Sequence, residues 1–121
     1  MVRKKPGNPS KAALPKLTAF DAAARELQQA IRSIAEDTVR VFFLPHAQER
    51  MAERGIDAAD VYRVLRSGFV DEASLEPGEN AGEQVCKVVE HNKGARDLGV
   101  VTIVIRERKL LVKTVEWEDF R

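Results

Sequence analysis

Cysteine is nearly absent from this sequence, in which Cys86 is the single example. One cysteine cannot form a disulfide within the chain, and this favours a reducing compartment. Long apolar runs are also missing, since the longest are short stretches such as residues 100–105, well below the roughly 18 residues needed to span a bilayer. No hydrophobic signal-peptide segment follows the basic N-terminus. We therefore expect a cytoplasmic protein with no membrane partner.

Signature motifs of several enzyme classes are missing too. The sequence has no phosphate-binding loop, no dinucleotide-binding glycine pattern and no nucleophile elbow. His46, Cys86 and His91 lack the spacing of metal ligands, so we expect no metal site and no cofactor. Cys86 has no base positioned beside it in the sequence, and we interpret it as a packed strand residue.

The composition that is present is that of an ordinary globular domain. The chain has 121 residues, of which 44% are hydrophobic and 32% are charged, and this fits one domain. The net charge of +1 conceals an asymmetry, because residues 1–16 carry five cations and no acid. The remaining chain carries 15 basic and 19 acidic side chains, a net charge of −4. Each phosphate contact uses a cation, so this balance speaks against extensive nucleic-acid binding by the folded core.

The N-terminal region divides into a basic arm and an amphipathic helix. Residues 1–16 mix their five cations with three prolines and a glycine, without periodicity. We expect a disordered arm, which could by itself bind nucleic acid weakly. Residues 17–37 are expected to form a helix that begins at Thr18, with Asp21 as the partner in a capping box.

An apolar stripe runs along this helix at alternating spacings of four and three residues. It consists of Phe20, Ala24, Leu27, Ile31, Ile34 and Thr38. The stripe is expected to pack on the rest of the domain. The alternative is a partner surface, including a homodimer through helix 18–38.

Residues 38–121 are expected to form an α+β domain. Pro45 suits the first turn of a helix 45–54, and Gly55 suits its left-handed end. A second helix is expected between the cap Asp57 and the stop Gly68.

Five strands are expected, at 38–43, 69–75, 84–90, 100–106 and 109–117. The segment 100–106 is almost continuously apolar and should be a central strand that is buried on both faces. The order of elements predicts an antiparallel sheet with the helices packed on one face.

The expected helix 45–54 carries His46, Arg50 and Arg54 four residues apart. Steps of four rotate a position by about 40°, so the three side chains lie within an arc of roughly 80°. His46 is at the second helical position, where the helix dipole disfavours the imidazolium, and a neutral imidazole can accept a proton.

The two arginines offer planar, bidentate binding to phosphate, so the stripe has the chemistry of a phosphodiester site. The alternative is structural: a first-turn histidine beside surface arginines that pair with Glu49 and Glu53.

Two more polar features lie towards the C-terminus. His91, Lys93 and Arg96 share the loop 91–99 and could bind phosphate, or could simply be solvated in a hairpin loop. Trp117 could stack on a base, although a tryptophan that closes a sheet is more often part of the core.

Several motifs resemble those of a known family. The stretch HAQERMAERGIDAADVYRVLRSGFV at 46–70 contains a His-Ala-x-x-Arg-Met-x-x-Arg-Gly-Ile box, an Asp-Val helix and a Leu-x-x-Gly stop. The segments 85–105 and 110–117 are similar to the strands of the same pattern, including a terminal Thr-Val-x-Trp. Through these motifs, about two-thirds of the chain (38–118) resembles an uncharacterised bacterial domain family related to the RelE/ParE toxin superfamily.

The resemblance implies a RelE/ParE-like α+β fold, with a helical hairpin packed on an antiparallel sheet and, here, an extra N-terminal helix. Members of the superfamily cleave messenger RNA or poison gyrase, usually beside an antitoxin protein, and the RelE-type nucleases use no metal. His46, Arg50 and Arg54 match the family box. Arg96 stands where the family has a Gly-Arg loop, although the order here is Gly-Ala-Arg-Asp.

The leading hypothesis is therefore a toxin-like domain that acts on mRNA as a metal-independent endoribonuclease, with RNA or the ribosome as a partner. His46 would serve as general acid or base, and Arg50 and Arg96 would stabilise charge in the transition state. Substrate would be bound by Arg54, Lys93 and His91. The alternative is a non-catalytic protein-binding or regulatory module of the same fold, which the net charge of −4 outside the arm favours.

Overall fold

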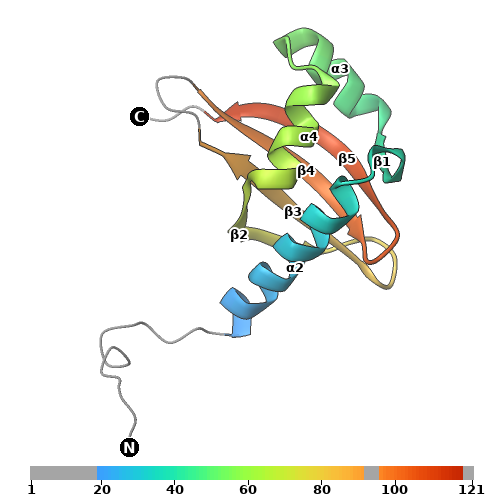
Figure 1. Cartoon of the computed structure of the whole chain (residues 1–121), viewed down its shortest axis with the longest axis vertical. Helices are drawn as coiled ribbons and strands as arrows, with labels where there is room; N and C mark the ends of the chain where they lie inside the picture. The colour runs from blue at the N-terminus through green and yellow to red at the C-terminus, as the bar shows by residue number, and fades with distance from the viewer. Residues whose placement is uncertain (1–18, 92–95, 119–121) are drawn as a thin grey trace, which may run out of the picture.

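The computed structural model describes residues 19–91 and 96–118, and side chains from Asp21 onward in the first of these ranges. Within them the chain forms three α-helices and one five-stranded sheet, which confirms the expected α+β class (Figure 1). The expected arm at 1–16, the cap at Thr18 and the loop residue Lys93 lie outside the described residues. No helix in the described ranges is long and apolar enough to cross a membrane.

Helix α2 (Ala19–Ala35) packs its apolar stripe into the core of the same chain. Leu27, Ile31 and Ile34 are at most 2% exposed. The helix contacts helix α4 and strand β2, where the Gln28 side chain accepts a hydrogen bond from the backbone N–H of Val70 at 2.8 Å. These residues of the stripe therefore pack within the chain, as expected, whereas Thr38 at its end lies in a 3₁₀ turn and is exposed.

The helical hairpin has the expected boundaries. Helix α3 (Pro45–Arg54) ends at Gly55, whose φ of 68° lies in the left-handed region that glycine adopts without strain. Helix α4 (Ala58–Ser67) begins with a capping box between Asp57 and Asp60. The backbone hydrogen bond of Asp57 to Asp60, which outweighs partial burial, and the neighbouring Arg63 lower the pKa of Asp60 below its usual 3.8.

The sheet has the strand order β1-β5-β4-β3-β2. Four strands form the expected antiparallel meander, namely β2 (Phe69–Pro77), β3 (Glu83–Glu90), β4 (Asp97–Ile105) and β5 (Lys109–Glu118). Strand β1 (Val41–Phe43) pairs parallel to β5, so the expectation of a wholly antiparallel sheet is wrong.

The segment 38–40, expected to be part of the first strand, forms a 3₁₀ turn η1 (Thr38–Arg40). The Asp37 side chain accepts a hydrogen bond from the Val39 N–H at 3.2 Å and holds the chain in this turn. The strand can begin only after the turn, and it therefore has three residues.

All three helices lie on one side of the sheet (Figure 1). On that side β4 presents Leu98, Val100 and Val104, each at most 1% exposed. On the other side Val101, Ile103 and Ile105 are only half-buried. β4 is the central strand, as expected, but the expectation that it is buried on both faces is wrong, because no described helix covers the second face.

Candidate functional site

The three residues of the α3 stripe have different environments. His46 is exposed in the first turn and has no partner among the described residues. Arg50 forms an ion pair with Glu53 at 2.6 Å, one turn further along the same helix. Arg54 donates to the backbone carbonyl of Val115 on β5 at 3.1 Å, through a part-buried hydrogen bond. Of these three residues, only His46 lacks a hydrogen bond or ion pair within the described part of the chain, and Arg54 joins the helix to the sheet.

Three of the predicted site residues lie with Asp97 and Trp117 at the end of the β3–β4 hairpin. We call this group the hairpin-end cluster; it comprises Arg54, His91, Arg96, Asp97 and Trp117. The indole N–H of Trp117 donates to the Arg54 carbonyl at 3.2 Å, and the Arg96 guanidinium lies 5.4 Å from the centre of the Trp117 ring. This distance is that of a cation–π contact. Trp117 is half-buried against the core, as expected for a residue that closes the sheet.

His91 and Asp97 face each other where β3 ends and β4 begins, because the pair Glu90–Leu98 is the last rung between these strands. Nδ1 of His91 lies 2.6 Å from a carboxylate oxygen of Asp97, while the His91 side chain is 72% exposed. A carboxylate at Nδ1 orients the ring and leaves Nε2 facing solvent, which is the arrangement of a general acid or base.

Of the six predicted site residues the structure describes five, and three of these lie at the end of the β3–β4 hairpin, whereas His46 and Arg50 lie further back along α3. His91, Arg96 and Arg54 belong to the hairpin-end cluster. His46 lies eight residues before Arg54 on α3, about 12 Å along the helix axis at about 1.5 Å per residue. His46, Arg50 and Arg96, the residues predicted to be catalytic, do not converge on one point.

A recess that the sequence did not reveal lies on the side of the sheet opposite the helices. Two adjoining hollows of about 380 and about 470 Å³ share Glu76 and Val85, and we call them together the open-face hollow. Its apolar floor consists of Val85, Val101, Ile103 and Leu111. Its rim carries Glu76, Glu79, Glu83, Glu116, Lys87 and Lys113.

A bulge in β2 builds one wall of this hollow. Asp71 pairs with Lys87 and Glu76 with Val85, so residues 72–75 stand opposite Cys86 alone. The Ser74 hydroxyl accepts the backbone N–H of Lys87 at 2.8 Å and donates to the Asp71 carbonyl at 2.5 Å. These bonds replace the missing ladder contacts and hold the bulge out from the sheet.

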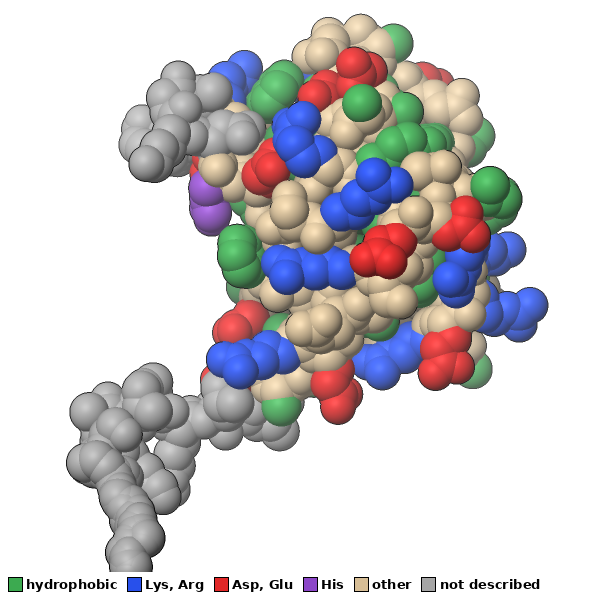
Figure 2. Space-filling model, in the orientation of Figure 1, with side chains coloured by type: hydrophobic (Ala, Val, Ile, Leu, Met, Phe, Trp, Pro, Cys, Tyr) green, Lys and Arg blue, Asp and Glu red, His purple; other side chains and the backbone are tan. Residues whose placement is uncertain are grey.

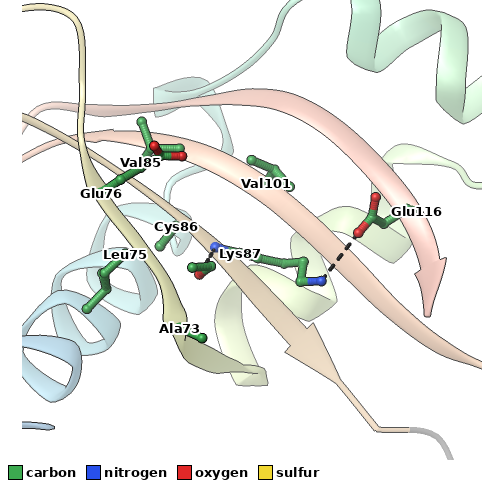
Figure 3. A pocket seen from close by; sticks show the side chains of 9 residues that line it. Ala73, Leu75, Glu76, Val85, Cys86, Lys87, Val101 and Glu116 are labelled. Carbon is green, nitrogen blue, oxygen red and sulfur yellow. Dashed lines mark hydrogen bonds and ion pairs between the residues drawn. The ribbon is translucent and has the colours of Figure 1, made fainter. Parts of the chain in front are cut away.

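The Lys87 side chain crosses the floor of the hollow from β3 towards β5 (Figure 3). Its ammonium lies 3.3 Å from Glu116 and 3.0 Å from Glu118. Partial burial opposes the charged form, but the hydrogen bonds and charges of Glu118 and Glu116 outweigh it and raise the pKa of Lys87 above its usual 10.5. Gly99 leaves room for this pair, since a Cβ there would lie 2.7 Å from a Glu118 oxygen.

The hollow is acidic overall. With Glu118 it has five carboxylates against two lysines, and one of the lysines is bound by two of those carboxylates. The helix-covered side differs, because basic and acidic side chains alternate over it without a continuous patch of either sign (Figure 2).

Cys86 offers no chemistry in this region. The side chain is 1% exposed, and burial raises the pKa of its thiol to about 12. A thiol protonated at neutral pH and shielded from solvent is not a nucleophile. In residues 19–91 and 96–118, no three His, Cys, Asp or Glu side chains are grouped closely enough to hold a metal ion.

The fold and its surface define a small α+β domain with helices on one face of a sheet and an acid-rimmed hollow on the other. Residues 43–117 match the family described as "Domain of unknown function (DUF4258)", and the chain belongs to this family. The matched segment contains α3, α4 and the strands that form the hollow and the hairpin-end cluster, whereas α2 precedes it. No curated protein and no solved structure matches the chain.

Proposed function

We propose that this protein is a non-catalytic protein-binding module. Its open-face hollow binds an extended segment of a partner that carries both basic and apolar side chains. The observation that supports this most directly is an apolar floor that is partly exposed at Val101, Ile103 and Leu111, with five carboxylates and two lysines around it.

The chemistry of the hollow favours a polypeptide over a nucleic acid. Burying apolar surface on the floor contributes about 25 cal/mol per Å². Basic side chains of the bound segment would pair with the rim carboxylates, and this complementarity gives specificity and fast association. A phosphodiester backbone would instead be repelled by the same carboxylates.

The proposal extends to the class of fold. A helical hairpin on one face of a largely antiparallel sheet, together with the box at 46–56, supports a RelE/ParE-like domain with an extra N-terminal helix. Under this proposal the partner is an antitoxin-like protein or another regulator whose segment fits the hollow.

A second candidate is a toxin-like, metal-independent endoribonuclease that acts on mRNA. The His91–Asp97 pair at 2.6 Å supports it, because a carboxylate orients the histidine, and Arg96, the residue before Asp97 in the chain, carries an exposed cation. In this candidate His91 acts as general acid or base, and Arg96 stabilises the negative charge of the transition state.

One experiment separates the two candidates. Full-length protein is titrated, by fluorescence anisotropy, with labelled peptides that alternate lysine with valine or leucine, and in parallel is incubated with single-stranded RNA and with translating ribosomes. The double variant Glu76→Lys/Glu79→Lys should weaken peptide binding about tenfold or more, which corresponds to about 1.4 kcal/mol. The matched control Glu36→Lys/Glu49→Lys makes the same charge change at exposed positions outside the hollow and should bind as the wild type does.

Peptide binding that is equal in both double variants would remove the hollow as the binding surface. RNA cleavage by the wild type that His91→Ala abolishes would replace the binding module by the nuclease. If the cleavage were lost in His46→Ala and kept in His91→Ala, the site would be the α3 stripe.

A further inference from the structure

The charges of this chain are divided between two parts. Residues 1–16 hold five cations and no acid, and the rest of the chain has a net charge of −4. Within the described residues, five of the carboxylates surround the open-face hollow with only two lysines among them. The N-terminal segment is therefore positively charged, and the hollow in the rest of the chain is negatively charged.

We propose that the N-terminal segment of the same chain, residues 1–18, occupies the open-face hollow. The inference uses the surface on which the proposed function rests, and it adds a regulator of that surface. The segment competes with a partner, which must displace it in order to bind.

The side chains of the segment match the hollow. Ala12, Ala13 and Leu14 are consecutive and lie between Lys11 and Lys16, so apolar side chains are flanked by cations. The hollow has the reverse arrangement, with an apolar floor between carboxylates. An extended chain can therefore bury its apolar side chains on the floor and pair its cations with the rim.

The segment also joins the fold at the right edge. Helix α2 begins at Ala19, and Asp21 and Arg25 line a common recess with Val70 and Glu72 of β2. The next residue of β2, Ala73, already lines the open-face hollow. The segment has only to pass around the edge strand β2.

Length does not limit this path. Eighteen residues span up to about 60 Å when extended, at about 3.3–3.6 Å per residue. The nine-residue strand β2 is about 30 Å long by the same kind of estimate. A tethered segment of this kind competes at an effective concentration of roughly millimolar order.

The test is a zero-length cross-linking experiment on the full-length protein. A carbodiimide joins a lysine amine to a carboxylate only when the two are in contact, and mass spectrometry identifies the joined residues. We expect cross-links from Lys4, Lys5, Lys11 or Lys16 to Glu76, Glu79 or Glu116 within one chain. The variant Glu76→Gln/Glu79→Gln should lose the links at these two positions without gaining links to Glu36 or Glu49.

A one-to-one mixture of isotope-labelled and unlabelled protein identifies the occupant. Links that join labelled to unlabelled chains would overturn the proposal, because the occupant would then be the segment of a second copy. Links spread evenly over Glu36, Glu49 and the hollow would overturn it too, since the segment would have no docking site.

A second measurement separates this inference from the proposed function. The full-length variant with Lys4, Lys5, Lys11 and Lys16 changed to alanine should bind the lysine–valine peptide about tenfold or more tightly than the wild type, because a tethered competitor has been weakened. Equal affinities would overturn the inference and leave the binding module in place. Cross-links in the hollow without binding of any peptide would support the inference and remove the proposed function.

Discussion

Val100 and Val101 are neighbours on the central strand β4, yet they face two very different sides of the sheet. Val100 is fully buried beneath the helices, whereas Val101 is half-buried on the floor of the open-face hollow. Their sequence environment is nearly the same, so the covering layer alone makes the difference. The covered side forms the core of the fold, and the open side leaves apolar surface and charge partly accessible to solvent.

The largest expected effect comes from placing a charge on each side. Val100→Asp should unfold the domain, because an unpaired buried carboxylate costs several kcal/mol against a total stability of about 5–15 kcal/mol. Val101→Asp should fold, since its side chain reaches solvent, but it should lose peptide binding. Circular dichroism and thermal melting check both variants. A Val100→Asp variant that stays folded would contradict the burial of Val100 beneath the helices.

Arg54 and Lys87 are cations that bind partners on opposite sides of the sheet, so their substitution tests the two sides separately. Arg54 on the covered side binds the Val115 carbonyl through a part-buried hydrogen bond, and its own carbonyl accepts from Trp117. Arg54→Met should lower the free energy of unfolding by about 1–3 kcal/mol, because the buried carbonyl of Val115 loses its charged donor. Arg50→Met, which loses only an exposed pair with Glu53, should cost less than about 1 kcal/mol. Urea denaturation measures both, and equal losses would contradict the structural role of Arg54.

On the open side the corresponding cation is Lys87, and its effect depends on pH. Its folded pKa is raised above the usual 10.5, so its stabilising contribution is complete below that pH and is lost as the pH rises through the folded pKa. Lys87→Met should therefore cost less than about 1 kcal/mol at neutral pH. It should also show a shallower loss of stability above pH 10.5 than the wild type does. Identical alkaline unfolding curves would show that the two glutamates do not hold the ammonium in solution.

The smallest effects are expected for the two histidines. Both are exposed and lie outside the open-face hollow, so His46→Ala and His91→Ala should change stability by less than about 0.5 kcal/mol. Neither should change peptide affinity. Anisotropy titrations check this, and a clear loss in either variant would extend the binding surface to α3 or to the hairpin-end cluster.

The elements that the sequence predicted correctly are those with local signals. Pro45 and Gly55 mark the two ends of α3, and Asp57 and Gly68 mark those of α4, each through residues next to the helix itself. The parallel pairing of β1 with β5 joins residues about 70 positions apart, and the bulge in β2 depends on Ser74 reaching Lys87. Neither of these contacts produces a periodic pattern of residues, so neither could be predicted from the sequence.

In the candidate site, too, local features were predicted from the sequence and long-range contacts were not. The register of His46, Arg50 and Arg54 on one helix followed from spacing alone. The partner of Arg54 is 61 residues away in the sequence, so its structural role was not predictable from the motif. The open-face hollow was missed, although the end of β5 carried a signal. Val115, Glu116, Trp117 and Glu118 alternate apolar residues with glutamates there, which is the pattern of a strand with one solvated face.

The bulge in β2 also bears on how the sheet ends. In the described part of the chain β2 and β1 are the two edge strands, and an edge with unpaired N–H and C=O groups can template pairing with another chain and so promote aggregation. β2 interrupts this row with residues 72–75, and β1 offers only three residues. The displaced residues that build a wall of the hollow thus also stop the sheet from growing, so that binding on its open face need not lead to fibrous assembly.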